Sequence, residues 1–155
     1  MNICVTSGTG SGPTPLAAFD AALQDAGIAN FNLMLLSSVI PPNSTIQRRK
    51  YVPADHEYGT RLYVVMARHT EERPGISAWA GLGWTQGEER GEGLFVEIDG
   101  GNEAQVHRDI HCTLDSMVAR RPNHFGRIEQ LTIGVECHDA PVCAIVAAVY
   151  ATEGW

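Results

Sequence analysis

The segment Val142–Thr152, with the sequence VCAIVAAVYAT, restricts the possible folds more than any other part of the chain. Nearly every position in it is apolar, so it lacks the alternation of a strand that has one face in water. A continuous apolar run of this kind is typical of a strand that is buried on both faces. We therefore expect a central β-strand with a layer of structure on each side.

The rest of the chain supplies further strands and two helices. Short apolar runs separated by polar, glycine-containing turns indicate strands that pair in antiparallel fashion. The strands expected in this way are Ile3–Thr6, Arg61–His69, Ile76–Thr85, Leu94–Ile98 and Gln130–His138. The order of elements predicts an α/β sandwich with mixed, largely antiparallel sheets.

Both helices carry end signals. Thr14 is a good N-cap, Pro15 suits the first helical position, and Gly27 is expected to end the first helix. Asn102 is expected to cap a second helix, which runs to about Arg121. Its apolar side chains recur at helical spacing and form one face, namely Val106, Ile110, Leu114, Met117 and Val118.

Composition excludes several classes of protein. The chain of 155 residues has a net charge of −7, which argues against nucleic acid or an anionic membrane as the main partner and permits a cationic ligand. No apolar run reaches the roughly 18 residues of a membrane span, and the first residues lack the pattern of a signal peptide. Four cysteines without CxxC spacing are expected to be buried free thiols. We expect a cytoplasmic protein.

The glycine-rich segment SGTGSGPTP invites a nucleotide-binding interpretation, which its details exclude. Gly8, Gly10 and Gly12 do not have the spacing G-x-G-x-x-G, and Pro13 removes a main-chain amide that phosphates would need. We expect this segment to be a loop that makes a tight turn.

Ser37 and Ser38 form the most unusual polar pair. They interrupt the apolar run Asn32–Pro42, NLMLLSSVIPP, which otherwise is typical of a buried strand. A buried hydroxyl without a partner costs roughly 1–3 kcal/mol. Either these serines are hydrogen-bonded core residues or chemistry takes place at them.

Other candidate groups are weaker. His107 and His111 lie four residues apart on the second helix, but an exposed polar helix face explains them better than a metal site. Neither serine lies in a G-x-S-x-G elbow, so a hydrolase is disfavoured. Glu97 shares a strand face with Phe95 and Asp99 and is either a general acid–base or an exposed polar residue. Asp20 is either the solvent side of its helix or a buried anion.

Four segments together resemble the pyruvoyl-dependent arginine decarboxylases. They are TPLAAFDAAL, AGIANFNL, LSSVIPP and GLFVEIDG, in this order and spacing. The resemblance spans most of the chain. It implies a proenzyme that cleaves itself between Ser37 and Ser38 into a β chain, residues 1–37, and an α chain, residues 38–155. Ser38 would become a covalent pyruvoyl group, and no metal is expected.

The resemblance also implies roles for individual residues. The pyruvoyl group would form a Schiff base with L-arginine and accept electrons as CO2 leaves, which yields agmatine. The resemblance maps the proton donor onto Glu97 and a residue that orients the reacting centre onto Asn32. It maps the partner of the substrate guanidinium onto Asp20, with Ser37 also at the substrate site.

Two alternatives to this interpretation stay open. One is a homologue that is never cleaved and serves as a structural or regulatory subunit. The other is a pyruvoyl decarboxylase of another amino acid, because the segment 43–59 is only loosely similar to the family. This chain also lacks the N-terminal extension that some relatives carry.

We therefore predict one domain, residues 1–155, with a four-layer αββα sandwich and two main helices. The resemblance implies a homotrimer of αβ protomers with active sites at the subunit interfaces. L-arginine is the expected small-molecule partner.

Overall fold

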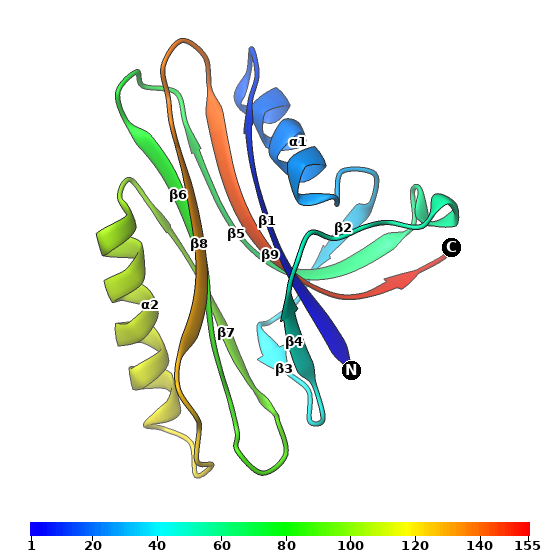
Figure 1. Cartoon of the computed structure of the whole chain (residues 1–155), viewed down its shortest axis with the longest axis vertical. Helices are drawn as coiled ribbons and strands as arrows, with labels where there is room; N and C mark the ends of the chain where they lie inside the picture. The colour runs from blue at the N-terminus through cyan, green and yellow to red at the C-terminus, as the bar shows by residue number, and fades with distance from the viewer.

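Two β-sheets lie face to face, and one helix covers the outer side of each (Figure 1). The computed structural model describes residues 1–155. The five-stranded sheet has the order β2-β5-β9-β1-β4, and the four-stranded sheet has the order β3-β7-β6-β8. The strands of the first are β1 (Asn2–Ser11), β2 (Asn32–Leu35), β4 (Thr45–Arg48), β5 (Arg61–Glu71) and β9 (Val142–Glu153). Those of the second are β3 (Val39–Ile40), β6 (Ser77–Gln86), β7 (Gly93–Gly100) and β8 (Glu129–Glu136).

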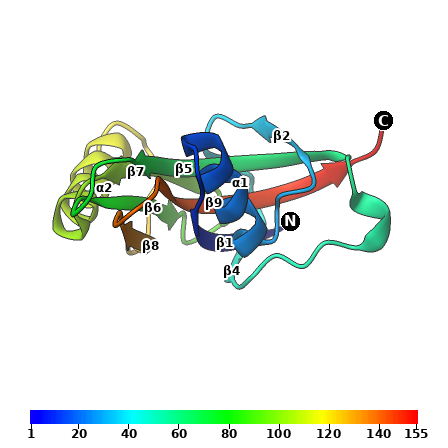
Figure 2. The same cartoon turned by 90° about the horizontal axis from the view of Figure 1, so that it is seen from above.

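The helices are α1 (Pro15–Ala26) and α2 (Glu103–Val118), and a 3-10 turn spans Asp55–Glu57. Apolar side chains such as Val5, Phe95 and Val146 form a core between the sheets. Separate cores lie under α1 and under α2. Seen from above, α2 lies beyond the four-stranded sheet, at one end of the stack (Figure 2). The predicted α+β sandwich of four layers is confirmed.

Strand β9 is the central strand that its composition predicts. It pairs antiparallel with β1 on one side and with β5 on the other. Residues Val142–Val149 are all buried, because the inter-sheet core covers one face of the strand and α1 covers the other. Burial on both faces explains why this segment contains no alternating polar residues.

The predicted helix caps are confirmed. The Thr14 hydroxyl accepts a hydrogen bond from the Ala17 amide, and Gly27 adopts a left-handed φ of 83° at the end of α1. The Asn102 side chain accepts from the Gln105 amide at the start of α2. These side chains satisfy backbone groups that the helix itself leaves unpaired.

The prediction of a glycine turn after residue 6 is wrong. Strand β1 continues to Ser11, and Gly8 and Gly10 lie within it, directly beneath α1. A Cβ atom at Gly10 would come within 2.5 Å of the Ala18 carbonyl oxygen, and one at Gly8 within 2.6 Å of the Ala26 amide nitrogen. Glycines two residues apart share one face of a strand, so their spacing marks the close approach of a helix.

The expectation of one buried strand over Asn32–Pro42 is also wrong. The chain forms β2 at the edge of one sheet and then β3 at the edge of the other. Met34, Leu35 and Val39 are 42%, 69% and 59% exposed. The apolar pattern of this segment therefore does not arise from burial within a single chain.

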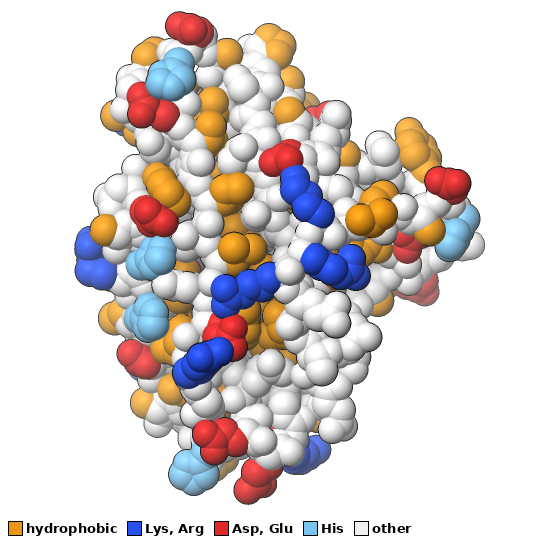
Figure 3. All heavy atoms as spheres, viewed as in Figure 1, with side chains coloured by type: hydrophobic (Ala, Val, Ile, Leu, Met, Phe, Trp, Pro, Cys, Tyr) orange, Lys and Arg blue, Asp and Glu red, His pale blue; other side chains and the backbone are white.

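Several surface features complete the description. Cys4, Cys137 and Cys143 are buried free thiols as predicted, whereas Cys112 is exposed on α2. Basic side chains gather around β4, where Arg48 pairs with Glu129 and Lys50 pairs with Asp25 (Figure 3). None of the helices has the length and apolar character needed to cross a membrane.

Replacing Gly10 by alanine tests the contact between α1 and β1. The added methyl group would meet the backbone of α1, which cannot move without opening the core beneath it. We expect Gly10→Ala to lower the free energy of unfolding by about 1–3 kcal/mol, as overpacked cores do, measured by urea denaturation. Gly154→Ala is the matched control, since a Cβ atom there has open space. Equal stability of the two variants would contradict this account of the glycines.

Candidate active site

The chain passes from one sheet to the other through Leu36, Ser37 and Ser38. The Leu36 amide still donates to Val64 of the five-stranded sheet, at 2.9 Å. Two residues later the Ser38 carbonyl oxygen accepts from the Phe95 amide of the four-stranded sheet, at 2.8 Å. Each end of this short crossing is thus held by a different sheet.

Ser38 adopts a left-handed backbone conformation at this crossing. Its φ is 63°, a value that glycine adopts freely and a serine rarely does. The left-handed region costs an ordinary residue roughly 1–2 kcal/mol. Strain of this kind persists only where the surrounding structure imposes it. Here it falls on Ser38, the residue on the C-terminal side of the Ser37–Ser38 peptide bond.

The Ser38 side chain meets a carboxylate. Its hydroxyl donates to Glu97 Oε1 with an Oγ–Oε1 distance of 2.5 Å. Strand β7 brings Glu97 there because Phe95, Glu97 and Asp99 alternate onto the face that looks toward the other sheet. Phe95 packs into the inter-sheet core, and Glu97 lies further along, where the core gives way to partly buried polar groups.

Asp99 continues this row of polar groups. Its Oδ2 lies 2.7 Å from Nδ1 of His69 on β5, so the pair links the two sheets. The imidazole and the carboxylate are 25% and 51% exposed, respectively. The acidic residue next to Glu97 on this face of β7, Asp99, is therefore already paired with His69.

Tyr150 approaches from the central strand β9. Its hydroxyl donates to the Val39 carbonyl oxygen at 3.0 Å, and its ring packs against Phe95 with centroids 6.2 Å apart. Burial, together with the nearby Glu97 carboxylate, raises the pKa of the Tyr150 phenol above its ordinary value. The phenol therefore stays protonated and able to donate throughout the neutral range.

Ser38 and Glu97 form an arrangement of the kind that acyl transfer to a hydroxyl requires. A hydroxyl, a carboxylate that can take its proton, and a strained main chain meet at one place. General base activation of a hydroxyl requires this kind of hydrogen-bonded contact. The peptide carbonyl of Ser37 directly precedes Ser38 in the chain.

The other predicted site residues lie elsewhere in the single chain. Asn32 begins β2 and donates from Nδ2 to the Gly59 carbonyl at 2.7 Å. Asp20 is exposed on α1 and accepts from the Gln24 side chain at 2.7 Å. Strand β2 extends by about 3.3 Å per residue away from Asn32, so this side chain is remote from Ser38. The structure brings Ser38 and Glu97 together but joins neither of them to Asn32 or Asp20.

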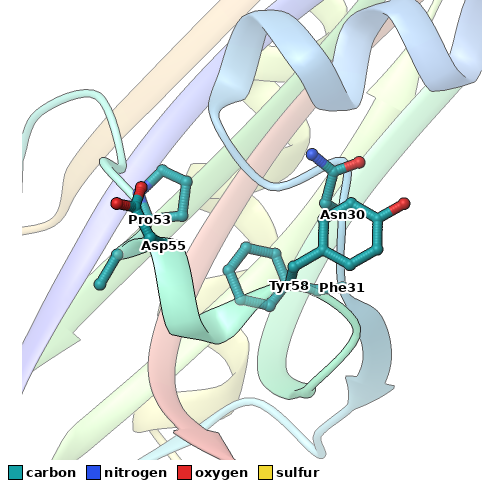
Figure 4. Close-up of a pocket in the computed structure, with 6 residues that line it drawn as sticks. Asn30, Phe31, Pro53, Asp55 and Tyr58 are labelled. Carbon is teal, nitrogen blue, oxygen red and sulfur yellow. The ribbon is translucent and has the colours of Figure 1, made fainter.

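A pocket of about 210 Å³ lies at the start of β2 (Figure 4). Two segments form it, the residues before β2 and those around the 3-10 turn. Its lining consists of Asn30, Phe31, Pro53, Ala54, Asp55 and Tyr58. The lining combines the carboxylate of Asp55 with the aromatic rings of Phe31 and Tyr58, and aromatic rings are suited to binding a cationic group.

Sequence reasoning missed Tyr150 and His69. The sequence predicts Tyr150 only as part of an apolar strand and His69 only as the end of another. A tyrosine near the end of a buried strand needs a partner for its hydroxyl, and that requirement is the signal that points to a site. No comparable signal marks His69, because its partner Asp99 comes from the other sheet.

Comparison with known proteins identifies relatives of this chain. Residues 2–154 match the family model described as pyruvoyl-dependent arginine decarboxylase. Proteins of that name from Methanopyrus kandleri and Thermococcus sibiricus are 34% and 33% identical, over 94% and 89% of this chain and 92% and 87% of theirs. One from Halobacterium salinarum is 42% identical over 61% of this chain, a match that spans only 58% of the relative's length.

The fold is a two-sheet α+β sandwich in which a serine and a carboxylate meet where the chain crosses between the sheets. The chain belongs to the pyruvoyl-dependent arginine decarboxylase family.

Proposed function

We propose that this chain is a self-processing decarboxylase that converts L-arginine to agmatine and CO2 with a pyruvoyl group made from Ser38. The observation that carries the proposal is the 2.5 Å contact between Ser38 Oγ and Glu97 Oε1 at a left-handed Ser38, in a chain of this family. The names of its relatives supply the substrate and the covalent group.

The proposed cleavage uses only groups of this chain and water. The Ser38 hydroxyl attacks the Ser37 carbonyl carbon, the C–N bond breaks, and an ester replaces the amide. Removal of the Ser38 α-proton then expels the Ser37 carboxylate and leaves dehydroalanine. Addition of water and loss of ammonia give the pyruvoyl group at the start of the α chain, residues 38–155. The β chain, residues 1–37, ends in a carboxylate.

In this proposal Glu97 moves protons in both reactions. It accepts the Ser38 proton during cleavage, for which its hydrogen bond is already formed. During decarboxylation it gives the proton that replaces CO2 on the substrate's α-carbon.

The residues around position 38 fit a pyruvoyl group. The Phe95 amide holds the residue's carbonyl oxygen, and the Glu97 carboxyl group lies beside its side chain. When present, this group supplies an electron sink for the loss of CO2.

Asp20 and Asn32 are proposed to bind the substrate, and their distance from Ser38 calls for a second subunit. A carboxylate such as Asp20 can bind a guanidinium through two parallel hydrogen bonds. Asn32 would orient the reacting end of the substrate, and Ser37 would border it. We propose that Asp20 and Asn32 act together with the Ser38 of a neighbouring subunit.

The proposed assembly is a homotrimer of αβ protomers with its sites at the interfaces. The exposed apolar side chains Met34, Leu35 and Val39 support it, because they flank the crossing at Ser38. Contiguous exposed apolar residues commonly mark protein–protein contacts. The proposed compartment is the cytoplasm, a view supported by four cysteines that are all unpaired.

Intact-mass measurement of the purified chain tests the cleavage. We expect two polypeptides, one ending at Ser37 and one beginning with a pyruvoyl group at position 38. Ser38→Ala removes the nucleophile, so it should give a single mass near 16.8 kDa. Ser11→Ala, an exposed serine of β1, is the control and should cleave normally. A wild-type chain of one mass, or a Ser38→Ala chain that functions normally in cells, would favour the structural or regulatory alternative.

The substitution Asp20→Ala tests the choice of substrate. Loss of a charged hydrogen-bonding partner should reduce kcat/KM for arginine by about 10- to 100-fold. Lysine, ornithine and histidine should be affected much less in a CO2-release assay, because they have no guanidinium. Asp115→Ala, which removes an exposed acid from α2, is the matched control. A uniform loss across all four amino acids would remove Asp20 from the specificity site.

A charge at Leu35 tests the subunit interface. Leu35 is 69% exposed in the single chain, so Leu35→Glu should leave the protomer folded and shift it from trimer to monomer. Size-exclusion chromatography with light scattering measures this, and decarboxylase activity should fall with the trimer. Leu16→Glu is the control, since Leu16 is 74% exposed on α1. An unchanged trimer in Leu35→Glu would exclude this edge from the interface.

A further inference from the structure

The contact between Tyr150 and Val39 lies on the C-terminal side of the Ser37–Ser38 bond. The Ser38 carbonyl faces β7, where it accepts from the Phe95 amide at 2.8 Å. Because successive residues of a strand point their backbone groups in opposite directions, the Val39 carbonyl faces away from β7. The Tyr150 hydroxyl meets it there, at 3.0 Å.

This hydrogen bond joins the two sheets. Val39 belongs to β3 at the edge of the four-stranded sheet, whereas Tyr150 belongs to β9 in the middle of the five-stranded one. Strand β3 has only two residues, paired with Leu94 and Gly93. A strand this short has little ladder of its own, so a side-chain contact contributes a large share of what holds it.

The importance of the contact changes when the chain is cut. In the intact chain, Ser38 is tied covalently to Ser37, and the Leu36 amide anchors that side to Val64. After cleavage, residue 38 becomes a chain end, and only contacts on its C-terminal side restrain it. They include the Phe95 amide, the short pairing of β3 with β7, the Tyr150 hydroxyl and the fully buried Ile40 side chain.

We propose that Tyr150 is a positioning residue that holds the start of the α chain in place once the Ser37–Ser38 bond has been cut. The inference rests on the proposed function, since it concerns the cleaved protein. Tyr150 acts through Val39 and its immediate neighbours, residue 38 and Ile40, so that position 38 stays in register with Glu97. It is not a catalytic residue in this account.

The hydroxyl alone is responsible for the effect, so Tyr150→Phe is the informative variant. It keeps the ring against Phe95, where the centroids are 6.2 Å apart, and so preserves the packing of the core. Tyr63→Phe is the matched control. It removes a hydroxyl that donates to Glu153 and not to the chain around Ser38.

The first measurement is amide exchange at Ile40, followed by NMR, because its N–H faces β7. In the cleaved protein, Tyr150→Phe should speed exchange about 3- to 10-fold, which corresponds to one ordinary hydrogen bond. In the uncleaved Ser38→Ala background, the same substitution should leave Ile40 exchange and the melting temperature nearly unchanged. Tyr63→Phe should change Ile40 exchange in neither background.

The second measurement separates positioning from substrate binding. Tyr150→Phe should lower kcat for arginine about 3- to 10-fold while KM changes little, because the substrate's own contacts remain.

The possible results distinguish a failure of this inference from a failure of the proposed function on which it rests. A wild-type chain of one mass overturns the proposed cleavage, and this inference with it. A cleaved Tyr150→Phe protein with wild-type Ile40 exchange and kcat overturns the positioning role alone. Equal acceleration of exchange in the cleaved and uncleaved backgrounds also overturns it, since the contact would then be a general structural one.

Discussion

The hydrogen bond between Ser38 and Glu97 depends on the way the chain changes sheets. A chain that leaves the edge of one sheet at Leu36 and joins the edge of the other at Ser38 has very few residues in which to turn. The left-handed φ of 63° at Ser38 is the geometric result of this short crossing. The same turn directs the serine hydroxyl toward β7, where Glu97 faces the space between the sheets. Backbone strain and the hydroxyl–carboxylate contact thus have one common origin.

The four-layer arrangement explains why the candidate site lies at the edge of the space between the two sheets. Between the sheets, the core is closed by large apolar side chains such as Phe95. The edge formed by β2 and β3 is open, because β2 has four residues and β3 only two. Polar groups that would be costly in the core are tolerated along this edge, where His69 meets Asp99 and Ser38 meets Glu97.

The sequence predicted the layers well because they follow from local patterns. The apolar run at Val142–Val149, the caps at Thr14 and Asn102, and the helical spacing of Ile110 and Leu114 each report their own surroundings. Alternation along β7 also placed Glu97 on the face it occupies. Two expectations failed for the same reason. The close approach of α1 to Gly10 and the exposure of Leu35 depend on which elements come together, and no local pattern encodes that. The contact between Tyr150 and Val39 joins residues 111 positions apart, beyond the reach of any periodicity.

The position of β1 has a consequence for the proposed two-chain product. Strand β1 lies inside the five-stranded sheet, between β9 and β4, and both of these neighbours belong to residues 38–155. Cutting the chain after Ser37 therefore does not divide the protein into two folded parts, because each piece lacks strands that the other supplies. What the cut removes is the tether that keeps the pieces at a high effective concentration. Unfolding then becomes a dissociation as well, so the stability of the mature protein depends on its concentration. The intact chain can refold as one molecule, whereas the two chains of the proposed product would first have to associate.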